Sequence, residues 1–411
     1  MSRRPYHRSL PAANTDLSSP PPVPYWRLSA WYFFYFGFVG CFMPYFSLYL
    51  NSVGLDAWQI SVVLAMMPLM RLLAPAFWGV MSDRLGRKAL LVRYVLAAST
   101  LMFSGFLMTT NFVAMVVLML LMSLFWSASL PLVEALTLGH LRLEAERYGQ
   151  VRLWGSIGFI AAVQGVGVLL GWLPLTVVLW ISLGFLLAAG ATAAQIPESE
   201  IIPRTSESGP LRNSLLQPKV VALLLAGLLM SVAHTPLYTF YSIHLVAHGY
   251  GKAAIGGLWS LGVLMEIAVF AFMPKLMATG SVRNILIASF ALAALRFLLT
   301  GWAVALPAVA AFAQMLHGAS FGVHHAASIT ALNRWFSPRE QGTVQALFGS
   351  ISYGAGGVIG GVLTGFGWSR FGPEVTFSAA AVAALLGLLL IWFGLGREDS
   401  HLERICKGAV R

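Results

Sequence analysis

The sequence predicts an all-α integral membrane protein with twelve transmembrane helices arranged in two six-helix bundles. Of its 411 residues, 58% are hydrophobic and only 10% are charged, whereas soluble domains carry about 25% charged residues. The hydrophobic residues form runs that are long enough to cross the roughly 30 Å of hydrocarbon in a bilayer. These runs fall into two groups of six, separated by a polar stretch.

The individual spans follow from length, since a spanning helix needs about 20 mostly apolar residues at 1.5 Å per residue. The first group of runs lies at 27–50, 58–82, 89–109, 112–137, 151–171 and 174–196. The second group lies at 219–246, 254–277, 283–302, 305–332, 341–366 and 374–396. Two sets of six spans indicate a duplicated architecture of the kind found in secondary transporters.

The segments outside these runs define the remaining organisation. Residues 1–25 are rich in Pro, Ser and Arg and contain no apolar core, so we interpret them as a disordered cytoplasmic tail and not as a signal peptide. The polar, proline-interrupted residues 197–218 form a cytoplasmic linker between an N-terminal bundle at 26–196 and a C-terminal bundle at 219–396. Residues 397–411 form a second, charged cytoplasmic tail.

The positive charges predict the orientation of the chain. Twenty-two of the 26 Lys and Arg residues lie in the tails, loops and helix ends of one side. Only Lys252 and Arg370 lie in the loops of the other side, and Arg71 and Arg296 lie inside spans. The positive-inside rule therefore places both termini in the cytoplasm. Because topology explains the net charge of +11, we expect no nucleic-acid partner.

The acidic residues indicate where chemistry takes place within the membrane. Of fifteen Asp and Glu residues, only Glu134 and Glu266 lie deep inside apolar runs, where each costs on the order of 3 kcal/mol to insert. Glu134 and Arg152 are equally far from the loop that connects their helices, and Glu266 and Arg296 are nearly so. Antiparallel helices would place each pair at one depth, so we expect two ion pairs that lower the insertion cost. The alternative is that these acids are merely tolerated.

Histidine and tryptophan add further candidates. His317 lies near the middle of the tenth run, and His325 follows about two helical turns later on a similar face. Imidazole changes its charge near neutral pH, which suits proton relay or coupling. Trp154, two residues after Arg152, could stack on a planar ligand.

One loop motif points to a known family. The loop between the second and third runs reads Gly-Val-Met-Ser-Asp-Arg-Leu-Gly-Arg-Lys at 79–88. It resembles the signature of the major facilitator superfamily, which implies the two-bundle fold of that superfamily. We expect the loop to make cytoplasmic contacts that hold one conformation, through Gly79, Asp83, Arg84, Gly86, Arg87 and Lys88.

Within that superfamily the chain looks like the phenylpropionate permease group, relatives of lactose permease. The resemblance is strongest at 148–156, at 260–266 and at 316–325. It implies that Glu134 and Arg152 bind substrate.

The resemblance also implies that Arg296 and His317 belong to a proton-coupling network. Two departures from lactose permease affect this network. Ser320 stands where that permease has a coupling carboxylate, and Glu266 lies about one turn from its helix-eight carboxylate, although it matches the phenylpropionate group directly.

These observations predict a proton-coupled symporter of a bacterial inner membrane that imports a small organic solute, expected to be an aromatic carboxylic acid. Arg152 or Arg296 would hold the solute carboxylate, and Glu266 with His317 would change protonation, with His325 nearby. We expect a monomer whose partners are the solute, protons and lipid, with no metal or cofactor.

Other functions remain open at this point. A chain of this fold could instead expel drugs or metabolites, or import sugars or nucleosides with protons. A receptor or scaffold without transport would not require acids and bases within both halves. We do not expect an enzyme, because the sequence lacks paired zinc ligands, a serine nucleophile motif and a catalytic carboxylate pair.

Overall fold

The computed structural model describes residues 23–199 and 212–396. The tails expected up to residue 25 and from residue 397, and the middle of the expected linker, lie largely or wholly outside these ranges. Within them the chain forms helices joined by turns and short loops, without a β-strand. This confirms the all-α class.

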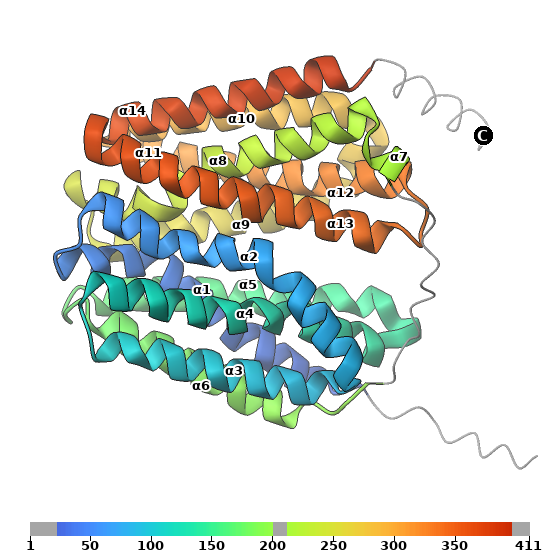
Figure 1. Cartoon of the computed structure of the whole chain (residues 1–411). Helices are drawn as coiled ribbons and strands as arrows, with labels where there is room; N and C mark the ends of the chain where they lie inside the picture. Colours follow the sequence, from blue (N-terminus) through green and yellow to red (C-terminus); the bar gives the residue numbers. More distant parts are fainter. Residues whose placement is uncertain (1–22, 200–211, 397–411) are drawn as a thin grey trace, which may run out of the picture.

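The first six long helices lie together in the lower half of Figure 1. They begin and end close to the predicted runs. Their bounds are α1 Tyr25–Ser52, α2 Ala57–Leu85, α3 Lys88–Ser104, α4 Phe112–Leu141, α5 Tyr148–Leu169 and α6 Val177–Gln195. Short 3₁₀ turns follow α3 and α4, at Gly105–Leu107 (η1) and Arg142–Arg147 (η2).

The second group lies above the first in Figure 1. It opens with the short helix α7, Arg212–Leu215. Three long helices follow, α8 Pro218–Ala247, α9 Lys252–Thr279 and α10 Val282–Trp302. The remainder contains two π-helical segments, and its elements are α11 Pro307–His317, η3 Gly318–Gly322, α12 Val323–Trp335, α13 Gln341–Gly349, η4 Ser350–Ala355 and α14 Gly356–Gly394.

Ten continuous helices of the described ranges are long and apolar enough to cross a membrane. The last of them contains 54 residues, more than twice the length that one span needs. It divides at Gly372, whose φ of 85° breaks the helix just before Pro373. The continuous helical segment formed by α11, η3 and α12 also has the length of one span, although the π-helix interrupts its α-helical hydrogen bonding. Counted in this way, the described ranges contain twelve helical segments of spanning length, the number that the hydropathy predicts.

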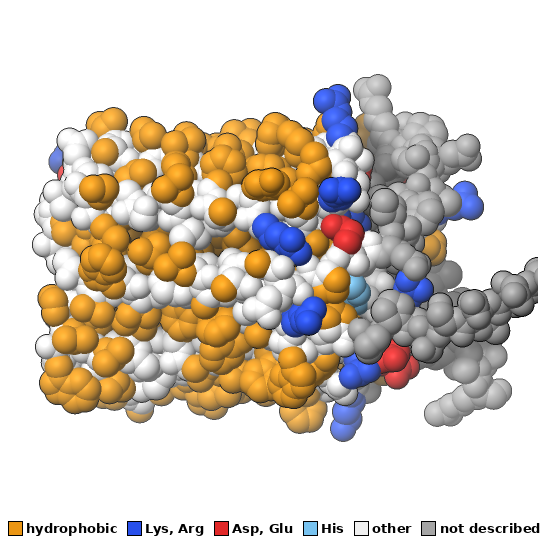
Figure 2. Space-filling model, turned by 90° about the horizontal axis from the view of Figure 1, so that it is seen from below, with side chains coloured by type: hydrophobic (Ala, Val, Ile, Leu, Met, Phe, Trp, Pro, Cys, Tyr) orange, Lys and Arg blue, Asp and Glu red, His pale blue; other side chains and the backbone are white. Residues whose placement is uncertain are grey.

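The surface fits a bilayer. Hydrophobic side chains cover most of the length of the face in Figure 2, and Lys and Arg side chains gather near one end. A charged end beside a long apolar flank is the arrangement expected where helices emerge from lipid into a headgroup region.

The two bundles touch along α2 and α14, at the end away from the Lys- and Arg-rich loops. Glycines on α14 permit this contact. A Cβ at Gly361 would lie 3.0 Å from the Cβ of Ala65, and one at Gly365 would lie 2.6 Å from the Cβ of Ser61. Only the absence of a side chain allows the backbones to approach so closely.

A matching contact joins α5 and α9 at the same end. The Tyr45 hydroxyl of α1 donates to the Val163 carbonyl at 2.8 Å and lies 3.3 Å from the Lys252 carbonyl of the other bundle. A Cβ at Gly256 would lie 2.7 Å from the Val163 oxygen. We call these two contacts, α2 with α14 and α5 with α9, the distal seam.

Candidate functional site

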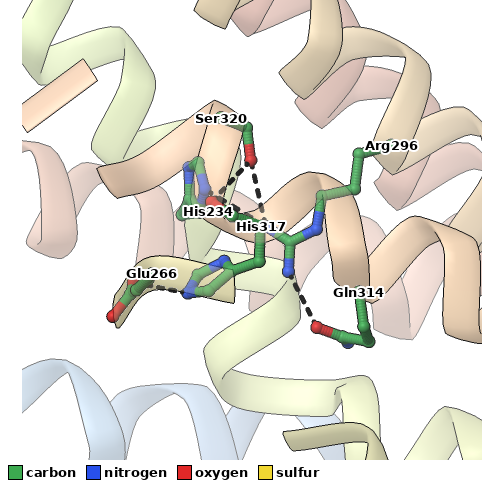
Figure 3. Close-up of polar contacts among 6 residues, drawn as sticks. All are labelled: His234, Glu266, Arg296, Gln314, His317 and Ser320. Atoms are coloured by element: carbon green, nitrogen blue, oxygen red, sulfur yellow. Dashed lines mark hydrogen bonds and ion pairs between the residues drawn. The ribbon is translucent and has the colours of Figure 1, made fainter. Parts of the chain in front are cut away.

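Polar side chains of the second bundle meet in the middle of the spans (Figure 3). They come from α8, α9, α10, α11 and η3, and all but Glu266 are buried. Polar groups in such surroundings require partners. The members of this cluster are His234, Glu266, Arg296, Gln314, His317 and Ser320.

An acid–imidazole pair forms one side of the cluster. The Glu266 Oε1 atom lies 2.9 Å from the Nε2 atom of His317, and the side chains of His317 and Glu266 are 9% and 21% exposed. Glycine makes the approach possible, because a Cβ at Gly318 would lie 2.5 Å from the Met265 carbonyl oxygen. Gly262 adds room on α9, since a Cβ there would lie 3.4 Å from the His317 ring. The backbone of η3 therefore packs directly against α9, and Glu266 faces the imidazole.

Arg296 forms the other side of the cluster and is fully buried. Its Nη2 donates to Gln314 Oε1 at 3.2 Å, while its Nη1 lies 3.4 Å from both Ser320 Oγ and His234 Nε2. Within the described ranges no carboxylate lies within ion-pair distance of this guanidinium, and its Nε has no hydrogen-bond partner. Arg296 is thus held by Gln314, Ser320 and His234 and not by a carboxylate.

The direct pairing of Glu266 with Arg296 expected from equal depth is therefore wrong. Figure 3 shows His317 between the two residues. The two helices are not neighbours in the bundle, because α9 and α10 each pack against α11 and η3, which lie between them. Equal depth along two helices does not make those helices neighbours.

The expected pair of the first bundle is also not a direct one. The Tyr148 hydroxyl donates to Glu134 Oε1 at 3.3 Å. The Arg152 guanidinium instead lies 4.0 Å from the centre of the Phe36 ring and 5.6 Å from that of Tyr32. Among the described residues no ion pair joins Glu134 to Arg152. Here too the hairpin partners are not the main neighbours, because α5 packs chiefly on α1, and α4 on α2 and α3.

Trp154 lies apart from the ring contacts of Arg152. Its indole N–H donates to the Tyr25 hydroxyl at 3.3 Å, and its ring centre is 5.8 Å from that of Trp26. The structure therefore places Trp154 against the first turn of α1, and it does not bring this ring to the guanidinium of Arg152.

His325 is linked to the second π-helical segment. Its Nδ1 lies 2.8 Å from the hydroxyl of Tyr353 on η4. The Tyr353 ring lies 6.2 Å from that of Phe321, which in turn stacks parallel on His317 at 5.5 Å. The two predicted histidines are therefore connected through rings that the sequence reasoning did not single out. Single-turn π-helices often occur at functional sites, but their hydrogen-bond pattern leaves no clear signal in sequence.

The signature loop connects α2 to α3. Gly86 ends α2 with a φ of 61°, a conformation that glycine adopts without strain, and its N–H bonds to the Ser82 carbonyl. The Glu198 carboxylate, which sequence reasoning missed, accepts from the backbone N–H of Lys88 at 2.8 Å and caps α3. The other predicted loop residues lie around this turn, with Gly79, Asp83, Arg84 and Arg87 exposed.

Arg71 on α2 was also missed as a candidate, although it carries a charge inside an apolar run. Its guanidinium carbon lies 5.9 Å from the centre of the Tyr353 ring, so it reaches the other bundle. The sequence signal was the same as for Glu266, a charged residue in mid-span.

The sequence and the fold are both similar to those of known membrane transporters. A family model described as "MFS_1 like family" matches residues 25–379. The chain is 30% identical over 369 residues to the "Probable 3-phenylpropionic acid transporter" of Escherichia coli, covering 87% of this chain and 94% of that protein. It is 26% identical to the maltose permease of Geobacillus stearothermophilus, covering 88% and 92%. A solved structure of a variant of the nucleoside transporter NupG aligns with a TM-score of 0.81 at 15% identity, covering 90% of this chain and all of that one.

Proposed function

Because this chain belongs to the MFS_1 like family, we propose that it is a proton-coupled symporter that imports an aromatic carboxylic acid. Its relatives are membrane transporters, which agrees with the expectation of a carrier and not an enzyme. The name of the Escherichia coli relative supports the solute class, since that similarity covers most of both chains. Proton coupling, direction and solute are the content of the proposal.

The observation that carries the proposal is the pair of Glu266 and His317 in mid-span. A carboxylate and an imidazole at 2.9 Å can share a proton, and the imidazole can gain or lose one near neutral pH. Neither group is held by Arg296, whose donors go to Gln314 and Ser320. We propose that this pair carries the proton, with Arg296 holding the neighbouring side chains around His317.

The solute would contact both bundles. In the first bundle the Arg152 guanidinium on the Phe36 ring, with Glu134 and Tyr148 nearby, presents a cation, an aromatic face and a hydrogen-bonding carboxylate. Aromatic rings attract planar solutes, and a carboxylate such as that of Glu134 accepts hydrogen bonds. We propose that these groups form the first-bundle side of the solute site.

The charge distribution supports an orientation with both termini in the cytoplasm of a bacterial inner membrane. In that orientation the signature loop with Asp83 is cytoplasmic and the distal seam closes the external side. The molecule would then present its solute site toward the cytoplasm in this conformation.

The test uses purified protein in proteoliposomes with an imposed pH gradient, and a panel of aromatic acids, sugars and nucleosides. We expect uptake of an aromatic acid such as 3-phenylpropionate, with protons entering alongside it. Uptake of sugars or nucleosides but not of acids would overturn the solute class. Uptake of the acid without proton flux would overturn the coupling. Expulsion of the acid from cells, in place of accumulation, would overturn the direction and favour efflux.

A further inference from the structure

Arg71 carries a charge at the middle of a span, and no carboxylate among the described residues pairs with it. It lies at the midpoint of α2, and its side chain is exposed. In the described part of the chain no carboxylate forms an ion pair with it and no acceptor takes a hydrogen bond from it. A charge at such a depth costs on the order of 3 kcal/mol to insert, so a guanidinium there calls for a partner.

The side chain of Arg71 lies between the two bundles. A Cβ at Gly354 of η4 would lie 2.9 Å from the Cβ of Leu72, so the backbones of α2 and η4 meet next to Arg71. This approach brings the guanidinium over the Tyr353 ring. Arg71 is also close enough to interact electrostatically with Tyr35 of its own bundle and Tyr238 of the other.

The neighbourhood of Arg71 on the second bundle is aromatic. The ring of Phe321 lies 6.2 Å from that of Tyr353 and 6.3 Å from that of Tyr238. The Tyr353 hydroxyl is engaged by His325, which fixes the orientation of the ring. These rings, with the cation beside them, match the two ends of an aromatic acid.

Arg296 and Arg152, the arginines that the sequence predicts to hold the carboxylate, are less suited to that role. Arg296 is fully buried and its donors are directed to Gln314 and Ser320. Arg152 lies on the Phe36 ring and only about one turn into α5, away from mid-span. Among residues 23–199 and 212–396 none accepts a hydrogen bond from Arg71, which lies, like Glu266, at the midpoint of its helix.

We propose that Arg71 binds the carboxylate of the transported acid between the two bundles, with the aromatic part of the acid against Tyr353, Phe321 and Tyr238. This assignment rests on the proposed function. A planar guanidinium with parallel donors would fix the orientation of the acid as well as its charge. It would also make solute binding depend on both bundles at once, because Arg71 belongs to one and the rings to the other.

The experiment measures equilibrium binding of 3-phenylpropionate and of its neutral amide to purified protein by calorimetry. Arg71→Gln should weaken binding of the acid by about 10- to 100-fold, as expected for loss of a charged hydrogen-bond partner, and change binding of the amide by less than about twofold. Arg71→Lys keeps the charge but loses the paired donors, so it should weaken binding of the acid by an intermediate factor. Arg283→Gln is the matched control, since that arginine also lies over a ring, at 4.8 Å from Trp392, at the far end of α10.

The outcomes separate this inference from the proposed function. If Arg71→Gln binds the acid as tightly as the native protein, or if its affinities for acid and amide fall equally, Arg71 does not bind the carboxylate. In that case only this inference is overturned. If the native protein binds no aromatic acid, the proposed function falls and takes this inference with it. Should Arg71→Gln fail to fold, Arg71→Lys decides the question, because the inference requires this variant to bind the acid more weakly while binding the amide as the native protein does.

Discussion

Replacing Glu266 with glutamine would remove the negative charge that lies 2.9 Å from His317 while keeping the volume of the side chain. The glutamine amide can still form a hydrogen bond with the imidazole, so the contact between α9 and η3 should persist. What disappears is the ability of this position to take up and release a proton. The variant therefore separates coupling from folding.

The size of the effect follows from the burial and distance of the pair. A hydrogen bond to a charged group contributes about 1.5–3 kcal/mol, and the exposures of 9% and 21% leave little room for screening by water. A loss of about 2 kcal/mol corresponds to about a 30-fold change in the equilibrium constant of this contact, at 1.36 kcal/mol per tenfold. For a monoanion that moves with one proton, a gradient of one pH unit corresponds to roughly tenfold accumulation by the same conversion.

The assay is uptake of the acid into proteoliposomes with the outside one pH unit more acidic and the membrane potential set to zero. The native protein should accumulate the acid about tenfold, and Glu266→Gln should reach a ratio of about one while still exchanging labelled for unlabelled solute. Glu374→Gln, which removes a carboxylate near the kink of α14, should behave as the native protein does. Tenfold accumulation by Glu266→Gln with undiminished proton uptake would refute the assignment of the proton to this pair.

Three further predictions concern other parts of the molecule. Gly158→Ala should lower the free energy of unfolding by about 1–3 kcal/mol, because the added Cβ would lie 2.1 Å from a backbone oxygen of α1. Gly165→Ala, which has open space around its Cβ, should leave that free energy unchanged. Thermal unfolding compares the two variants, and equal melting temperatures would contradict this packing. Asp83→Asn should slow transport about tenfold with an unchanged Kd, measured by uptake and calorimetry, and a parallel loss of affinity would argue against a conformational role. The Ser337 hydroxyl and N–H donate to Glu340 and lower the pKa of its carboxyl below the ordinary range of a glutamate. This stabilisation is present above the ordinary pKa and is lost as the pH falls through the lowered one, so the Ser337 amide should lose protection from hydrogen exchange over that acidic range. A protection factor that stays constant throughout an acid titration would contradict it.

The spans could be predicted because one physical quantity, apolar length, determines them. It even separated the two spans on either side of Gly372, which the single long helix α14 joins across its kink. It could not show the π-helical segments η3 and η4, because the extra residue in each turn has no compositional mark. These segments carry Phe321 and Tyr353, which is why both rings were missed.

The candidate site could be predicted only in part, for a different reason. Depth is encoded in distance from a loop, and it correctly brought Glu266 and Arg296 to one polar cluster. Which helices stand side by side is decided by packing across the whole bundle, so the direct partner of Glu266 is His317 and not Arg296. Arg71 was visible as a charge inside a span, but its meaning depends on η4, a segment some 280 residues further along the chain.

The distal seam has a consequence for how the molecule opens. It joins glycine backbones to small side chains and a tyrosine hydroxyl, and its described contacts include no ion pair. Separating such surfaces leaves no stranded charges, so the energy that resists separation is short-ranged and falls away within an ångström or two. Ionic strength should therefore have little influence on the rate of opening. The charge-dependent part of the opening free energy would then come from the region of Arg71, Glu266 and the histidines. Binding of the solute and the proton there, and not the contacts of the distal seam, would control when the two bundles separate.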